Sequence, residues 1–193
     1  MNEADVIKIL KKKLGFSDNS IEKLKKFHNH LLEYNKRYNL ISKSTESSVW
    51  LRHILDSAQI IRFLDLKKVN NIADFGTGGG FPGIIIAIYN DNASFHVKLY
   101  EKSPVKRDFL INVKNKLNIK NLSIENNVYE KQIIADVIVA RAFKKLNEII
   151  KISREIVKKP HKIVVLKGKS AQLEINNVSL DSNYSYNLEN SIT

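Results

Sequence analysis

Residues 73–83 read ADFGTGGGFPG and hold five of the seven glycines in this chain of 193 amino acids. An apolar run, Asn71–Phe75, leads into them and is predicted to be a strand. A second apolar run, Pro82–Tyr89, follows and is predicted to be a helix, because proline is suited to a first helical turn. Glycines at a strand-to-helix turn let the backbone approach a ligand, so we expect a ligand-binding turn here.

On the C-terminal side of this turn, short apolar runs alternate with helical patterns. The patterns predict one helix capped by Ser103 and another at Leu146–Val157. The predicted strands are Phe95–Tyr100, Leu122–Glu125, Ala135–Ala140 and Ile163–Leu166. Such alternation is typical of an α/β fold with a parallel sheet flanked by helices. Asn183–Leu188 is a candidate for one further strand of a closing hairpin, and its partner strand is missing, so we expect an incomplete sheet edge.

On the N-terminal side the sequence is helical. Three apolar stripes predict helices: one ending at Gly15, one capped by Ser17 or Asp18, and one at Val49–Ile61. A polar break, Ser42–Ser48, separates the last two. We therefore expect a helical region at residues 1–68 that caps the active site, and a ligand-binding domain at residues 69–193, together forming one compact unit.

The composition limits the classes of function. A net charge of +12 favours a polyanionic partner such as nucleic acid, although a general bias towards lysine would also produce it. The absence of cysteine excludes disulfides and thiol nucleophiles, and the five histidines form no metal-ligand pattern. No apolar stretch is long enough to span a membrane, and Met1–Asp5 begins no signal peptide. We expect a cytoplasmic protein without a metal.

Two ligands compete for the glycine turn. The pattern GxGxxG at residues 78–83, followed by Glu101, matches a dinucleotide fingerprint. However, the pattern nearest the strand end is DxGxG at residues 74–78. Its acid, Asp74, would repel a pyrophosphate, whereas it suits the ammonium group of S-adenosylmethionine (SAM). SAM is therefore favoured, with Gly78 beside its methionine part and Glu101 on its ribose hydroxyls, and NAD is the alternative.

The residues also restrict the methyl acceptor. Methylation of pyrimidine C5 in RNA normally needs a cysteine, which is absent. Methylation of exocyclic amines commonly uses an Asp/Asn-Pro-Pro-aromatic turn, whereas Asp136–Phe143 contains no proline. A ring nitrogen such as guanine N7 has a lone pair and no proton to remove, so its methylation needs mainly alignment and electrostatics. The sequence is consistent with such an acceptor.

Several short strings, taken in order, resemble one family across about residues 25–175. The sequence resembles the RsmG (GidB) methyltransferases of bacterial small-subunit ribosomal RNA. The strings are Tyr34–Leu40, Arg52–Ser57, Phe81–Gly83, Lys106–Leu110, Arg141–Phe143 and Leu166–Gly168. The resemblance implies a Rossmann-like SAM-dependent methyltransferase sheet, SAM as donor, and N7 methylation of one guanine in the 530 loop of 16S rRNA.

The resemblance also implies site residues. SAM contacts fall at Gly76, Phe81, Val128, Tyr129 and Arg141, to which the patterns above add Asp74, Gly78 and Glu101. The family often has an acid where this chain has Tyr129, a change that a backbone contact to adenine would tolerate. We expect Arg141 to position the SAM carboxylate or a phosphate of the target, with no general base. His53 and Asp56 are interpreted as structural residues of the helical cap.

Cations that follow two predicted strands are candidates for binding RNA: Lys102, Lys106 and Arg107 after one, Lys167 and Lys169 after another. The expected partner is 16S rRNA or the small ribosomal subunit particle, bound by a monomer. Two other functions stay open. One is methylation of a different RNA site or of a small molecule, and the other is a non-catalytic rRNA-binding assembly factor.

Overall fold

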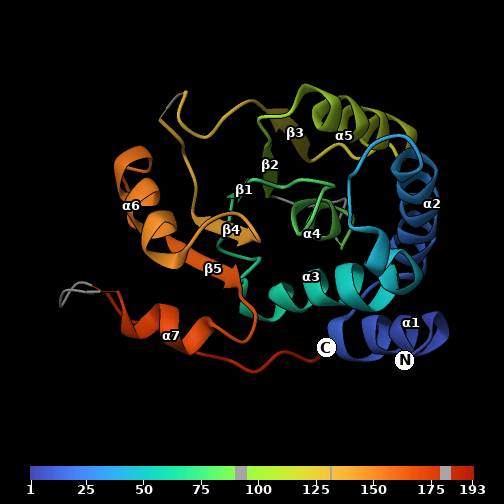
Figure 1. The fold of residues 1–193 in the computed structure, drawn as a ribbon, viewed down its shortest axis with the longest axis horizontal. Helices are drawn as coiled ribbons and strands as arrows, with labels where there is room; N and C mark the ends of the chain where they lie inside the picture. Colours follow the sequence, from blue (N-terminus) through green and yellow to red (C-terminus); the bar gives the residue numbers. More distant parts are fainter. Residues whose placement is uncertain (90–94, 131, 179–183) are drawn as a thin grey trace.

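A parallel β-sheet forms the centre of the molecule (Figure 1). The computed structural model describes residues 1–89, 95–130, 132–178 and 184–193. The five strands are β1 (Asn71–Phe75), β2 (His96–Tyr100), β3 (Leu122–Glu125), β4 (Val137–Arg141) and β5 (Lys162–Leu166). Their order is β3-β2-β1-β4-β5, and every pairing is parallel. The predicted Rossmann-like fold, a parallel sheet flanked by helices, is confirmed, with each of these strands within two residues of its predicted bounds.

Residues that alternate along the strands face two separate hydrophobic cores. On β4, Val137 and Val139 belong to one core, while Ile138 and Ala140 belong to the other. The first core includes α4 (Gly83–Tyr89) and α5 (Pro104–Lys116), and the second includes α6 (Leu146–Ile156). Figure 1 shows α6 on one side of the sheet and α4 and α5 on the other. A sheet covered on both faces explains why its strands read as nearly continuous apolar runs.

The N-terminal helices add to the first core. Ser17 caps α2 (Asp18–Asn35), accepting a hydrogen bond from the Ser20 amide at 3.1 Å. Together with α1 (Glu3–Leu14), α2 packs apolar side chains into the same cluster as α4 and α5. The predicted polar break at 42–48 contains a 3₁₀ helix, η1 (Lys43–Ser48).

The predicted third helix has three parts instead of one. It comprises a π-helical segment, η2 (Trp50–Leu55), a short α-helical turn, α3 (Asp56–Ala58), and a 3₁₀ segment, η3 (Gln59–Phe63). π-Helical segments often occur at functional sites. The changes of helical geometry put Arg52, His53 and Asp56 against the end of β4, as described below.

The prediction of a strand at Asn183–Leu188 is wrong for the described residues 184–188, which form no strand, while Asn183 lies outside the described residues. Tyr184 instead packs its ring under the Arg154 guanidinium, and Ser191 and Ile192 hydrogen-bond to Gln59. A helix that was not predicted, α7 (Ala171–Asn176), follows β5. Among the described residues, no helix combines the length and apolarity needed to cross a membrane.

Candidate active site

A cavity of about 590 Å³ opens at the carboxyl ends of the central strands. Its volume is in the range of small-molecule and cofactor sites. It is lined by the glycine turn after β1, the residues after β2 and β3, and the end of β4. The lining residues are Leu40, Ile41, His53, Gly76, Thr77, Gly78, Gly79, Phe81, Tyr100, Glu101, Lys102, Lys106, Asn126, Asn127, Val128, Tyr129, Arg141, Ala142, Phe143 and Lys144.

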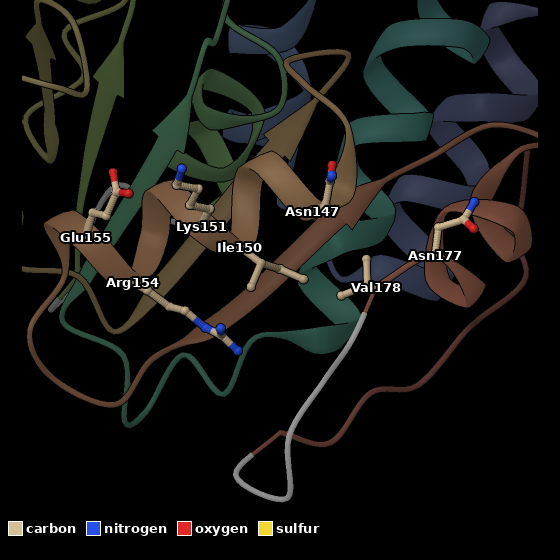
Figure 2. A pocket seen from close by; sticks show the side chains of 7 residues that line it. All are labelled: Asn147, Ile150, Lys151, Arg154, Glu155, Asn177 and Val178. Atoms are coloured by element: carbon tan, nitrogen blue, oxygen red, sulfur yellow. The ribbon is translucent and has the colours of Figure 1, made fainter.

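A second hollow, of about 360 Å³, lies over the outer face of α6 and the end of α7 (Figure 2). Its labelled side chains include Lys151, Arg154 and Glu155 from α6 and Asn177 and Val178 after α7. It contains none of the predicted site residues and lies away from the glycine turn. The larger cavity at the strand ends is therefore the candidate active site.

The glycine turn presents its backbone to this cavity. The amides of Gly76 and Thr77 donate to the carbonyl of Tyr100 at 2.9 and 3.1 Å, which fixes the turn beside β2. Gly76 and Gly78 have φ angles of 69° and 59°, in the left-handed region that favours glycine. A Cβ on Gly76 would lie 2.2 Å from the Phe143 ring, whereas one on Gly78 would meet only a backbone oxygen at 4.0 Å. The space at Gly78 is thus left for a ligand.

Asp74 lies beneath the turn and does not line the cavity. Its side chain is fully buried, and one oxygen accepts hydrogen bonds from the Thr77 hydroxyl at 2.6 Å and the Gly83 amide at 2.8 Å. The other oxygen has no partner among the described residues. Burial raises the pKa of the carboxyl to about 7, against the opposing effect of these hydrogen bonds. Asp74 therefore shapes the glycine turn from below.

Glu101 lies at the end of β2 and does line the cavity. One carboxylate oxygen accepts from the Gly78 amide at 2.9 Å, and the other accepts from the Ser103 amide at 2.8 Å. These bonds fix the carboxylate and leave further lone pairs on each oxygen. Glu101 thus links the glycine turn to the start of α5 and still offers acceptors to hydroxyl groups.

Arg141, the last residue of β4, is held by the N-terminal helical region. Its guanidinium donates to the carbonyl of Arg52 at 2.9 Å and pairs with the Asp56 carboxylate at 3.2 Å. It also contacts Nδ1 of His53 and lies over the Phe81 ring, 5.1 Å from its centre. Burial lowers the pKa of the guanidinium, and the Asp56 carboxylate opposes that shift. The side chain is 16% exposed, so most of its hydrogen-bonding capacity is used within the protein.

His53 is a hydrogen-bonded part of this cluster and is neutral at pH 7. Burial and the cations Arg141 and Arg52 lower its pKa to about 4. Its Nε2 lies 2.8 Å from the Thr45 hydroxyl, which itself donates to the carbonyl of Ser42. Since Thr45 uses its proton there, Nε2 of His53 carries the proton and Nδ1 accepts from Arg141. The prediction of a structural role for His53 and Asp56 agrees with these contacts.

The remaining predicted SAM contacts lie on the cavity wall. Phe81 is buried between the rings of Phe27 and His53, at 5.4 and 5.1 Å. Val128 is 2% exposed, whereas Tyr129 is 53% exposed and leaves its ring accessible at the cavity.

The five predicted RNA-binding cations differ in their surroundings. Lys102 and Lys106 line the cavity, and Lys169 is exposed. Arg107 donates to the carbonyls of Glu101 and Lys102 at 2.9 and 2.8 Å, so it stabilises the turn after β2. Lys167 pairs with Glu174 at 2.8 Å and donates to the carbonyl of Lys144. These two cations have intramolecular partners that the sequence pattern did not indicate.

With this geometry in place, the comparisons with known proteins identify the family. Residues 20–192 match the family GidB, described as "rRNA small subunit methyltransferase G". The chain belongs to this family. The sequence resemblance to RsmG (GidB) is thereby confirmed.

Members of the family from several bacteria match most of the chain. A "Ribosomal RNA small subunit methyltransferase G" from Pelagibacter ubique is 36% identical over 86% of this chain and 80% of its own length. The protein of the same name from Rickettsia prowazekii is 36% identical over 90% of this chain and 88% of its own length. A solved structure of a variant of MtNAS in complex with S-adenosylmethionine is 12% identical, with a TM-score of 0.52 over 86% of this chain and 67% of its own. This last likeness shows the fold alone.

Several cavity residues of this RsmG-family protein were not predicted. Leu40 and Ile41 come from the segment after α2, and Asn126 and Asn127 follow β3. Ala142 has a φ of 50°, a left-handed conformation that turns the chain sharply after Arg141. The strings Tyr34–Leu40 and Arg141–Phe143, which carry part of the family resemblance, include Leu40 and Ala142. No sequence signal placed the first one against the glycine turn.

Among the residues that the structure describes, no group of three or more His, Asp or Glu side chains is arranged to hold a metal ion.

Proposed function

We propose that this protein transfers a methyl group from SAM to N7 of a guanine in the 530 loop of bacterial 16S rRNA. The observation that carries the proposal is the cavity at the strand ends of an RsmG-family chain. Its wall is formed by glycine backbone, and a carboxylate lies at its side. We also propose that the protein acts as a monomer in the cytoplasm, on rRNA or a small-subunit particle.

The cavity residues fit the donor chemically. The open space at Gly78 admits the methionine part of SAM, because a Cβ at this position would occupy it. Glu101 has lone pairs for ribose hydroxyls, and the accessible ring of Tyr129 and the buried side chain of Val128 offer apolar surface to adenine. Asp74 supports the donor site from beneath, because its carboxyl group holds the Thr77 hydroxyl and the Gly83 amide of the glycine turn in place. When bound, SAM supplies an electrophilic methyl group on a sulfonium.

The protein's own residues position the guanine and the donor, and they transfer no protons. N7 of guanine carries no proton, so its methylation requires no base. His53 has both ring nitrogens in hydrogen bonds and its pKa is lowered to about 4, which makes it a poor base at the site. Catalysis then consists of aligning the guanine with the methyl group. Arg141 supplies fixed positive charge at the end of β4.

Methyl transfer to purified small-subunit RNA and to particles at several assembly stages tests the proposal. Labelled SAM and mapping of the modified nucleotide should locate the methyl group at N7 of one guanine of the 530 loop. Modification of another nucleotide would refute the proposed site. Calorimetry separates the remaining functions: failure to bind SAM at about millimolar concentration would favour an assembly factor, and binding of NAD instead would favour an oxidoreductase.

A further inference from the structure

One segment that the proposed function does not yet use is residues 36–43, which run from the end of α2 to the first residue of η1. We call it the rim segment. Leu40 and Ile41 line the cavity, and the carbonyl of Leu40 lies 3.3 Å from where a Cβ on Gly79 would be. The segment therefore lies directly against the glycine turn, although about 40 residues separate the two in the sequence.

Asn35, the last residue of α2, holds the rim segment in place. Its Oδ1 accepts hydrogen bonds from the amides of Leu40 and Ile41, at 2.8 and 2.9 Å. Its Nδ2 donates to the carbonyl of Ile41 at 3.2 Å and to the Glu46 carboxylate at 2.6 Å. The side chain is 5% exposed, and these four bonds use its full capacity. Hydrogen bonds of this kind are strong in a buried position, so the Asn35 side chain fixes the backbone at Leu40 and Ile41.

A second contact ties the far end of the rim segment to the active site. The Thr45 hydroxyl donates to the carbonyl of Ser42 and accepts from His53, which in turn contacts Arg141. The segment is thus anchored at both ends to residues that line or support the cavity. An element used only as a surface connection would not need such anchoring.

Four of the six residues that the rim segment exposes to solvent are cationic or aromatic, and the other two are Asn39 and Ser42. Lys36, Arg37 and Lys43 are exposed, and none of them takes part in an ion pair among the described residues. Tyr38 is 43% exposed. Since a chain spans at most about 3.6 Å per residue, Lys36 and Lys43 lie within about 15 Å of the residues that line the cavity.

We propose that the rim segment is the RNA-binding edge of the active site, a proposal that rests on the proposed function. Lys36, Arg37 and Lys43 contact phosphates beside the cavity, whose lining also includes the cations Lys102 and Lys106 after β2. Tyr38 stacks on an unpaired base next to the target, because RNA loops are commonly recognised by stacking of splayed bases on aromatic side chains. Asn35 is a positioning residue that holds this edge.

The first test is a charge-removal triple variant of the rim segment, Lys36→Ala with Arg37→Ala and Lys43→Ala. The matched control removes three exposed lysines of α1, Lys8→Ala with Lys12→Ala and Lys13→Ala, which do not line the cavity. Both variants lose three positive charges, so a difference between them reports position and not net charge. Thermal melting confirms that each is folded.

RNA affinity is measured directly, by fluorescence anisotropy with a fragment of small-subunit rRNA that contains the 530 loop. The rim variant should bind at least about tenfold more weakly than the control, and its plot of log affinity against log salt should be shallower by about 2. Its affinity for SAM should equal that of the wild type. If the rim variant and the control bind RNA equally, the proposal is wrong.

Asn35 and Tyr38 are tested by steady-state kinetics of methyl transfer. Tyr38→Ala should raise KM for RNA, and Tyr38→Phe should restore it, because the ring alone stacks. Asn35→Ala should raise KM for RNA and weaken SAM binding together, since Leu40 and Ile41 lose their anchor; an unchanged KM would contradict the positioning role. Binding is measured independently of turnover. A protein that binds the fragment through the rim but methylates another nucleotide would refute the proposed function and retain this inference.

Discussion

Substitution of Gly78 by alanine separates donor binding from folding. Gly78 has a φ of 59°, and a Cβ there would have no contact closer than 4.0 Å, so the methyl group enters the cavity without striking the protein. The strain of a left-handed residue costs about 1–2 kcal/mol. For a chain of this size, each 1 kcal/mol lowers Tm by about 2–4 °C. The variant should therefore fold, with a Tm a few degrees below that of the wild type.

The effect on the donor should be larger than the effect on the fold. The added methyl group occupies the space that the ligand would use. A loss of about 1.4 kcal/mol in binding free energy corresponds to a tenfold rise in Kd. We expect Gly78→Ala to bind SAM at least about tenfold more weakly in isothermal titration calorimetry. Its affinity for RNA should be unchanged, since the rim segment is not altered.

Two other glycines provide the controls. A Cβ on Gly168 would have nothing within 4 Å and would lie outside the cavity lining, so Gly168→Ala should leave Tm and SAM affinity unchanged. A Cβ on Gly83 would lie 2.2 Å from a methyl group of Leu99 and 2.7 Å from the Asp74 carboxylate, so Gly83→Ala should destabilise the fold. If folded Gly78→Ala binds SAM like the wild type, the donor does not occupy this cavity as proposed.

Three further predictions concern the charged groups around the cavity. Arg141→Ala should reduce methyl transfer at least about tenfold, with a modest loss of Tm because the partly buried Asp56 carboxylate loses its partner; near-normal turnover would remove Arg141 from the active site. The pKa of His53 is about 4 in the folded protein, below its unfolded value, so the stability contributed by the neutral ring should be lost as pH falls from about 6.5 towards 4. His53→Gln should therefore show a flatter dependence of Tm on pH than the wild type. Parallel plots of Tm against pH for the two proteins would contradict the lowered pKa. The pKa of Asp74 is raised to about 7, so its effect on stability runs the other way: the stability contributed by the protonated carboxyl is lost as pH rises from about 4 through 7. The difference in unfolding free energy between Asp74→Asn and the wild type should therefore favour the variant more at pH 8 than at pH 5, measured by urea unfolding.

The sequence alone determined the sheet and the ligand-binding turn. Buried parallel strands are apolar on both faces, so β1 and β3 were predicted with their observed bounds. The concentration of glycines at the first strand-to-helix turn, followed by Glu101 at the next strand end, placed two walls of the cavity. Both signals are local, because a strand, a turn and a cap depend on residues that are neighbours in the chain.

Tertiary structure alone decided which side chains share the cavity and what each one does there. Asp74, predicted to contact the ligand, is buried beneath the glycine turn and supports it. Lys167 and Arg107, predicted to bind RNA, have intramolecular partners. The rim segment lies against a turn about 40 positions away in the sequence, and Arg141 contacts His53 and Asp56 from 88 and 85 positions away. Such contacts depend on how helices pack across a sheet, and a hydrogen bond between distant residues leaves no periodic trace in the sequence from which it could be predicted.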